Sequence, residues 1–280
     1  MSIPKPQSWL DCDIAVHSYI NGFVDLLKEK LESCLVGVYL HGSLAMGSYF
    51  PPKSDMDLII MTNNRLDADL AKSLNTSIAV YAETRPTIGS IECSVITMQT
   101  ARDVPEQMPY ELHYSGAWHE RILKDAVSYG VEQFDSDLPA HLMCVKEHGI
   151  CLYGMAIDDV FGEVSWRNFL LSVMDDFNWI VEGENICESP YYGVLNICRV
   201  LQIIVDGNEK YLSKYEGAVW GMENLPDEHI PLIQKALEVY ASDEPIDVGK
   251  QKTGGVTWDK TALLSFRDYA RRKVYTHENP

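Results

Sequence analysis

The sequence predicts a chain of two parts, an N-terminal α/β domain followed by a helical domain. Short apolar runs at 36–43 and 56–62 end or begin at glycine or acidic residues, which is typical of strands that enter turns. The segment 90–98 alternates in polarity and predicts a third strand. After about residue 110, helical periodicity replaces this alternation. We expect the domains to span 1–157 and 158–280.

Three further elements complete the predicted N-terminal domain. Apolar residues recur at helical spacing over 11–33, which predicts a helix. The segment 65–75 is interpreted as a second helix. The segment 137–154 predicts a helix closed by Gly149 and followed by a short strand.

The predicted second domain contains only helices and loops. Amphipathic or apolar patterns predict helices over 166–184, 193–206, 226–241 and 258–275. The segment 242–257 is rich in glycine and charged residues and predicts a loop or linker.

The helix predicted at 193–206 is apolar on nearly all sides. Its polar side chains, Asn196, Arg199 and Gln202, follow a three-residue spacing and form one stripe. Such a helix is buried, with a single face turned to something polar. Gly207 is placed to cap its C-terminus.

Composition restricts the cellular setting. No run of about 18 apolar residues occurs, so we expect no transmembrane helix. The N-terminal segment does not resemble a signal peptide. Seven cysteines without a C-x-x-C pair favour a reducing cytoplasm and disfavour a zinc site.

The net charge of −18 restricts the partners. An acidic surface repels polyanions, so nucleic acid is not expected as a partner. A cationic small molecule would be attracted, although acidity that serves only solubility explains the charge as well.

The chemically informative segment is 40–60, LHGSLAMGSYFPPKSDMDLII. Asp55 and Asp57 are two residues apart at the start of a strand, so both carboxylates can lie on one face. Carboxylates with phosphate oxygens and water are the ligands that Mg²⁺ prefers. The turn at Gly42 and Ser43, followed by a helical turn, offers backbone N–H groups to a triphosphate. This arrangement suits phosphoryl or nucleotidyl transfer.

Glu92 is the lone carboxylate in the uncharged strand predicted at 90–98. Such a residue suits a general base beside metal ions. The alternative is a surface residue of an edge strand.

These motifs resemble a known family. The Gly-Ser…Asp-x-Asp pattern is similar to the signature of the polymerase-β-like nucleotidyltransferases. The segments 109–118, 137–154 and 193–226 resemble, in the same order, parts of the streptomycin/spectinomycin 3″/9 adenylyltransferases. The likeness covers about 35–240. It implies an α+β fold, with a mixed sheet flanked by helices and then an all-α bundle that closes over ATP and the acceptor.

The resemblance also implies roles in the nucleotide site. Asp55, Asp57 and Glu92 match the residues that hold two Mg²⁺ ions, and Glu92 matches the general base. ATP, the co-substrate, would contact the turn at Gly42 and Ser43 as well as two cations of the helical domain, Arg199 and Lys214. The residues themselves leave alternatives open: Arg199 also suits a structural ion pair, and Lys214, in a segment interpreted as a polar loop, also suits a plain surface lysine.

The acceptor site is less well matched. Trp118 and Trp179 match tryptophans that pack on the antibiotic, although either also suits a core residue. The closest matches to the family's acidic residues for drug amines are Asn185 and Ser189, which are not acidic. Only Glu188 is acidic in this segment, and we therefore expect it to contact the acceptor.

The sequence therefore predicts transfer of AMP from ATP to a hydroxyl of an aminoglycoside or aminocyclitol, by a monomer. One alternative is nucleotidyl transfer to another hydroxylated small molecule or to a protein. An alternative of another class is a non-catalytic protein that binds a nucleotide or a drug.

Overall fold

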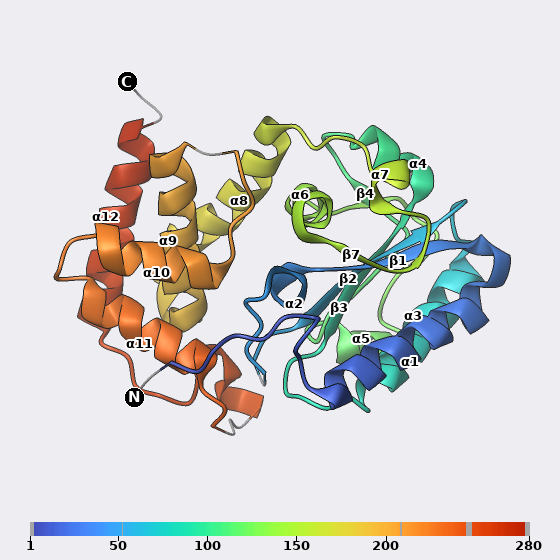
Figure 1. Ribbon diagram of the computed structural model, residues 1–280, viewed down its shortest axis with the longest axis horizontal. Helices are drawn as coiled ribbons and strands as arrows, with labels where there is room; N and C mark the ends of the chain where they lie inside the picture. Colours follow the sequence, from blue (N-terminus) through green and yellow to red (C-terminus); the bar gives the residue numbers. More distant parts are fainter. Residues whose placement is uncertain (1–2, 52, 208, 245–247, 278–280) are drawn as a thin grey trace. The chain divides into compact units, whose positions relative to one another are not determined.

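The computed structural model describes residues 3–51, 53–207, 209–244 and 248–277 of the chain (Figure 1). Contacts divide it into two compact units, Gln7–Phe169 and a second unit made mainly of the residues from Leu170 onward. The division falls inside helix α8, Trp166–Val181. The boundary after residue 157 stays a prediction.

A mixed five-stranded sheet forms the centre of the first unit, with strand order β5-β3-β2-β1-β7. β2 and β3 run parallel, and the other neighbours run antiparallel. The strands are β1 (Leu35–His41), β2 (Met56–Thr62), β3 (Ile91–Thr97), β5 (Leu112–Tyr114) and β7 (Ile150–Gly154). The predicted fold class, a mixed sheet flanked by helices with helices after it, is confirmed.

One face of the sheet is apolar and packs against two long helices, α1 (Ile14–Leu31) and α3 (Ala68–Ala82). Side chains such as Leu40, Leu58 and Val95 lie in this core and have no exposed surface. Figure 1 shows α1 and α3 on one side of the sheet and α6 on the other. Because side chains alternate along a strand, the residues between these apolar positions point to the opposite face.

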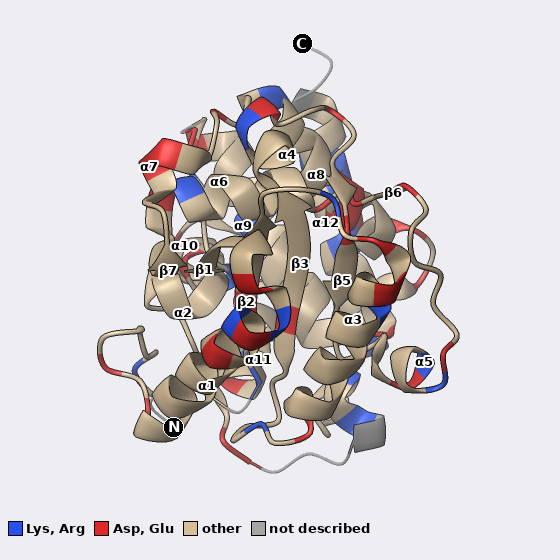
Figure 2. Ribbon diagram, turned by 90° about the vertical axis from the view of Figure 1, so that its right-hand side faces the viewer, with Lys and Arg blue, Asp and Glu red and all other residues tan. Residues whose placement is uncertain are grey.

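Short elements connect these layers. They are η1 (Glu32–Cys34), α2 (Gly42–Met46), α4 (Met98–Asp103), α5 (His119–Leu123), α6 (Leu138–His148), α7 (Ile157–Val160) and a two-stranded ribbon of β4 (Pro109–Tyr110) and β6 (Gln133–Phe134). Figure 2 shows the acidic residues of α7 together, while acidic and basic residues are interspersed over other elements in this view.

The helix predicted at 65–75 was placed too early and made too short. Asp67 is the N-cap of α3, where its carboxylate accepts a hydrogen bond from the amide of Leu70 at 2.8 Å. The helix continues to Ala82, since Ile78 and Ala82 are buried in the core of the sheet.

α9 (Pro190–Asp206) is the central helix of the second unit, in contact with α10, α11 and α12. The predicted buried helix is confirmed, and Gly207 caps it in the left-handed conformation with φ of 60°. The surrounding helices and turns are η2 (Asn185–Cys187), α10 (Lys214–Asn224), α11 (Ile230–Ala241), η3 (Val248–Thr253) and α12 (Lys260–His277). Residues 245–247 of the predicted loop lie outside the described residues.

Helix α10 is missing from the sequence prediction, and the interpretation of Lys214 as a loop residue is wrong. Lys214 is the first residue of this helix, after a capping box formed by Ser213 and Glu216. Gly217 weakens the helical signal in the sequence. A Cβ at this position would lie 2.6 Å from the backbone nitrogen of Arg199, so glycine is what allows α10 to cross α9 closely.

None of the helices in the described ranges is long and apolar enough to cross a membrane. None of the seven cysteines, all within the described ranges, forms a disulfide.

His229, the N-cap of α11, makes the stability of the second unit depend on pH. Its ring is 3% exposed and packs against Phe266 and Tyr269 of α12, with centroid separations of 5.1 and 4.9 Å. Burial lowers the pKa of His229, Glu228 opposes this shift, and Arg272 adds to it. Among the described residues, Nε2 has no hydrogen-bond partner.

We predict that the protein loses stability as the pH falls below about 6.5, the pKa of an unperturbed histidine. Because the folded pKa is lower than the unfolded one, the unfolded chain takes up the proton first, and the contribution of His229 is complete only above that pH. Urea unfolding of the wild type and of His229→Gln at about pH 7.5 and about pH 5.5 measures this. The variant should lose less stability on acidification, and an equal loss would contradict the assignment. Burial also lowers the pKa of His41 and His113, so some pH dependence remains in the variant.

Candidate active site

A row of polar side chains crosses three neighbouring strands on the face away from α1 and α3. His41 at the end of β1 is paired in register with Asp57 of β2, and Asp57 with Glu92 of β3. Residues paired in register project from the same face of a sheet, and neighbouring strands lie about 4.8 Å apart. The structure therefore places Asp57 beside Glu92, two of the three carboxylates predicted from the sequence.

Gly42, the first residue of α2, approaches the carboxylate of Asp57 closely. Its φ is +64°, and a Cβ built on it would lie 1.9 Å from Oδ2 of Asp57. No side chain larger than hydrogen fits between this turn and the carboxylate. The Gly42 amide donates to Sγ of Cys144 on α6 at 3.3 Å, so this N–H group is already engaged by the protein. Ser43 follows, half-buried, in the first turn of α2.

Asp55 lies just before β2 and is exposed. Its Oδ1 accepts a hydrogen bond from the amide of Ser90 at 2.8 Å. A Cβ on Gly89 would lie 2.0 Å from the carbonyl oxygen of Ser54, so the loops before β2 and β3 are in close contact. Asp55 is thus tied to the loop that leads into the strand of Glu92.

The chemistry of this donor set fits Mg²⁺. In the described part of the chain, no three histidine, cysteine or acidic residues are grouped closely enough to form a complete metal cage. Mg²⁺ does not require one, because it is usually bound by one or two carboxylates together with waters and substrate phosphates. Asp57, Glu92 and Asp55 carry the hard carboxylate oxygens that such a site would use.

His41 is the neutral member of the row. It is 3% exposed, and its ring lies 5.0 Å from the ring of His141 on α6. Burial holds its pKa well below the ordinary value, and His141 lowers it further. His41 therefore contributes packing and no positive charge at neutral pH.

Arg199 of α9 lies within the second unit with only 15% of its side chain exposed. Nη1 donates to the hydroxyl of Tyr211 at 3.5 Å, and Nη2 lies 4.0 Å from Oδ2 of Asp176 on α8. Burial acts to lower the pKa of Arg199, but Tyr211 and Asp176 outweigh it, and the net shift is upward. The guanidinium is therefore charged and has a nearby counter-charge.

Lys214, the second predicted ATP contact, lies over two aromatic rings. Its Nζ is 5.1 Å from the ring centre of Tyr192 and 5.7 Å from that of Tyr240. Such cation–π contacts hold an ammonium group without neutralising it. Gly217 brings the helix of Lys214 against Arg199, so both predicted cations belong to the crossing of α9 and α10.

The three residues predicted to contact the acceptor, Trp118, Trp179 and Glu188, do not form one cluster within either unit. Trp118 is partly buried against the core of the first unit, and Arg121 lies 4.6 Å from its ring centre. One face of this indole is thus already covered by a cation. Glu188 is exposed after the turn of η2.

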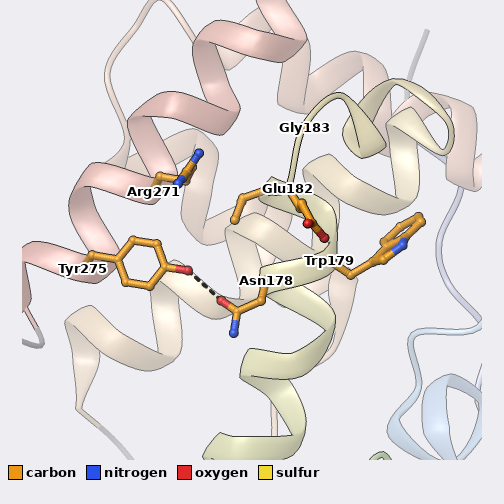
Figure 3. A pocket seen from close by; sticks show the side chains of 7 residues that line it. Asn178, Trp179, Glu182, Gly183, Arg271 and Tyr275 are labelled. Atoms are coloured by element: carbon orange, nitrogen blue, oxygen red, sulfur yellow. Dashed lines mark hydrogen bonds between the residues drawn. The ribbon is translucent and has the colours of Figure 1, made fainter.

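Trp179 is 41% exposed and lines a pocket of about 380 Å³ within the second unit. Figure 3 shows Trp179 and Glu182 at the end of α8, with Arg271 and Tyr275 reaching in from α12. The hydroxyl of Tyr275 donates to Oδ1 of Asn178 at 2.7 Å. Glu188 is not among the residues that line this pocket.

Sequence reasoning missed three residues that contact these groups: Cys144, Asp176 and Tyr192. Cys144 lies in a helix far along the chain from Gly42, and no sequence signal links the two. Asp176 follows another aspartate in an amphipathic helix, where a solvated face is the ordinary interpretation. The charged residue in the apolar helix 193–206 was the available signal, since a buried arginine requires a counter-charge nearby.

The fold and the carboxylate row are those expected of a nucleotidyltransferase, with helices after the mixed sheet. Residues 159–257 match the family model for the C-terminal domain of aminoglycoside adenylyltransferases. An aminoglycoside (3″)(9) adenylyltransferase of Klebsiella pneumoniae is 24% identical over 82% of this chain and 87% of its own length. A spectinomycin 9-adenylyltransferase of Staphylococcus aureus is 25% identical over 78% of this chain and 82% of its own length.

The solved structure of the spectinomycin adenyltransferase AAD(9) of Enterococcus faecalis, with ATP and spectinomycin, has the same fold. It superposes with a TM-score of 0.75 over 93% of this chain and 99% of its own, at 19% identity. Over most of its length the chain is therefore similar to aminoglycoside and spectinomycin adenylyltransferases.

We predict that Gly42→Ala disrupts nucleotide binding far more than Gly47→Ala does. Gly42 begins α2 and Gly47 caps its end, both with positive φ. A Cβ at Gly47 meets nothing closer than 3.6 Å, whereas one at Gly42 collides with the Asp57 carboxylate. Both variants carry a similar backbone strain of about 1–2 kcal/mol, so the comparison isolates the displaced carboxylate. Calorimetric titration with ATP and Mg²⁺ measures the affinities, and equal losses in the two variants would contradict the prediction.

Proposed function

We propose that this enzyme transfers AMP from ATP to a hydroxyl group of an aminoglycoside or aminocyclitol and releases pyrophosphate. The observation that carries the proposal is the pairing of Asp57 with Glu92 on neighbouring strands, next to a glycine turn that touches Asp57. Nucleotidyl transfer needs carboxylates for metal ions and a base within one small region. The similarity to adenylyltransferases over most of the chain supports the same reaction.

In this proposal Glu92 accepts the proton of the acceptor hydroxyl. The hydroxyl oxygen then bonds to the α-phosphorus of ATP as the bond to the pyrophosphate oxygen breaks, and AMP is left on the acceptor. When bound, two Mg²⁺ ions, held by Asp55, Asp57 and Glu92, would neutralise phosphate charge. Ser43 at the turn and the cations Arg199 and Lys214 bind the phosphates and keep the nucleotide aligned.

The acceptor is proposed to be a cationic molecule. The relatives are named for aminoglycosides and spectinomycin, and the net charge of −18 favours amines over anions. Trp179, with its exposed indole face, and Trp118 are proposed as walls for the acceptor's rings, and Glu188 as a partner for one of its amines. We propose that the enzyme acts as a monomer in the cytoplasm and binds no nucleic acid.

The direct test is incubation of the protein with ATP, Mg²⁺ and each of a panel of acceptors that includes spectinomycin and streptomycin. Mass spectrometry should find a gain of one AMP unit on an acceptor, with release of pyrophosphate. Transfer of AMP only to other hydroxylated compounds or to protein would replace the proposed acceptor class. Tight ATP binding without any pyrophosphate release would favour a non-catalytic binding protein.

We predict that Glu92→Gln lowers kcat by roughly 10²–10⁴-fold, the usual contribution of a general base. The affinity for ATP should change much less, because Asp55 and Asp57 remain as ligands. Steady-state kinetics and calorimetry on the same preparations separate the two effects. Glu132→Gln, which removes an exposed carboxylate of the same unit, should leave both values unchanged. Full activity of Glu92→Gln would show that another group takes the proton.

A further inference from the structure

A chain of contacts in the second unit joins the two cations through one tyrosine and one carboxylate. Tyr192 of α9 donates its hydroxyl to Oδ1 of Asp176 at 2.9 Å. Oδ2 of Asp176 lies 4.0 Å from Nη2 of Arg199. The ring of Tyr192 lies beneath the ammonium of Lys214, 5.1 Å from its nitrogen. Tyr192 therefore contacts one cation directly and faces the other through Asp176.

The separation of 4.0 Å between Asp176 and Arg199 is the informative distance. A hydrogen-bonded pair of an arginine and a carboxylate has nitrogen–oxygen distances of about 2.7–2.9 Å and is often bidentate. Here the carboxylate supplies a counter-charge to a largely buried guanidinium without forming a short hydrogen bond to it. Among the described residues, Nε of Arg199 also has no hydrogen-bond partner, although it is buried.

A buried arginine that binds an anionic ligand needs a counter-charge and also needs free N–H groups. An uncompensated charge inside a protein is strongly destabilising, so a counter-ion is required. A counter-ion that occupies the N–H groups would compete with any anionic ligand. A carboxylate kept at a distance meets both needs.

We propose that the Tyr192 hydroxyl holds Asp176 back from Arg199, so that the buried guanidinium stays available to the phosphates of the nucleotide. Tyr192 and Asp176 are then positioning residues. The inference rests on the proposed function, in which Arg199 contacts ATP.

The two residues have opposite effects on anion binding. In Tyr192→Phe the ring beneath Lys214 remains, but Asp176 loses its hydrogen bond and can close on Arg199, which weakens nucleotide binding. In Asp176→Asn the competing charge is gone, so binding stays as strong or becomes stronger, while the fold loses stability. In the double variant, Asp176→Asn has already removed the competing charge. The loss of the tyrosine hydroxyl then has little effect on nucleotide binding.

Calorimetric titration with ATP in the presence of Mg²⁺, and separately with inorganic tripolyphosphate, tests these effects. Tyr192→Phe should raise both dissociation constants about fivefold, the loss expected from one hydrogen bond. Asp176→Asn and the double variant should match the wild type or bind more tightly. Tyr275→Phe is the matched control, because it removes another tyrosine hydroxyl bonded to α8, at Asn178, and should not change the affinities. Thermal unfolding verifies that each variant is folded at the assay temperature.

If Tyr192→Phe and Asp176→Asn weaken ATP and tripolyphosphate binding equally, both residues only support the fold and the inference is overturned. An unchanged affinity of Tyr192→Phe for the two ligands would also overturn the inference, whatever affinity Asp176→Asn shows. If the wild type binds neither ATP nor tripolyphosphate, the proposed function is contradicted as well. The failure of the inference can therefore be told apart from the failure of the proposed function.

Discussion

The parallel pairing of β2 with β3 is the constraint on which the proposed chemistry depends. It sets Asp57 and Glu92 at the same register on one face of the sheet, while the opposite face is packed with apolar side chains. A slip of one residue would turn Glu92 toward the apolar core, where an unpaired carboxylate is strongly unfavourable. The same packing that stabilises the sheet therefore also fixes the position of the proposed base.

The turn at Gly42 adds a second constraint to this row. Its contact with Asp57 leaves no room for a Cβ, and its amide is bonded to Cys144 of α6. The turn thus meets the Asp57 carboxylate of β2, and a helix bonds to the turn. The proposed function places a different demand on the second unit. Arg199 is largely buried and Lys214 is half-buried, and both must stay charged and accessible to bind the nucleotide. Asp176 and the tyrosines around Arg199 and Lys214 stabilise those charges with contacts that are weaker than short ion pairs.

The sequence predicts local features well and long-range contacts poorly. The limits of β2 follow from an apolar run with an acidic entrance, and Gly207 predicts the end of α9. α10 was missed because Gly217, which serves helix packing, lowers the helical signal around Lys214. The pairing of Glu92 with Asp57 could not be derived from periodicity, since it joins residues 35 positions apart. The contacts of Asp176 and Cys144 depend on helix packing, which no local pattern encodes.

The magnesium dependence of nucleotide binding tests whether the carboxylate row holds the metal. Calorimetry would compare ATP binding with Mg²⁺ and with a chelator, in the wild type and in Asp57→Asn. We predict that Mg²⁺ strengthens binding in the wild type by at least about tenfold, a coupling of about 1.4 kcal/mol, and that the variant loses most of this gain. An equal magnesium effect in both proteins would contradict the placement of the metal at Asp57, and no effect in either would contradict the site as a whole.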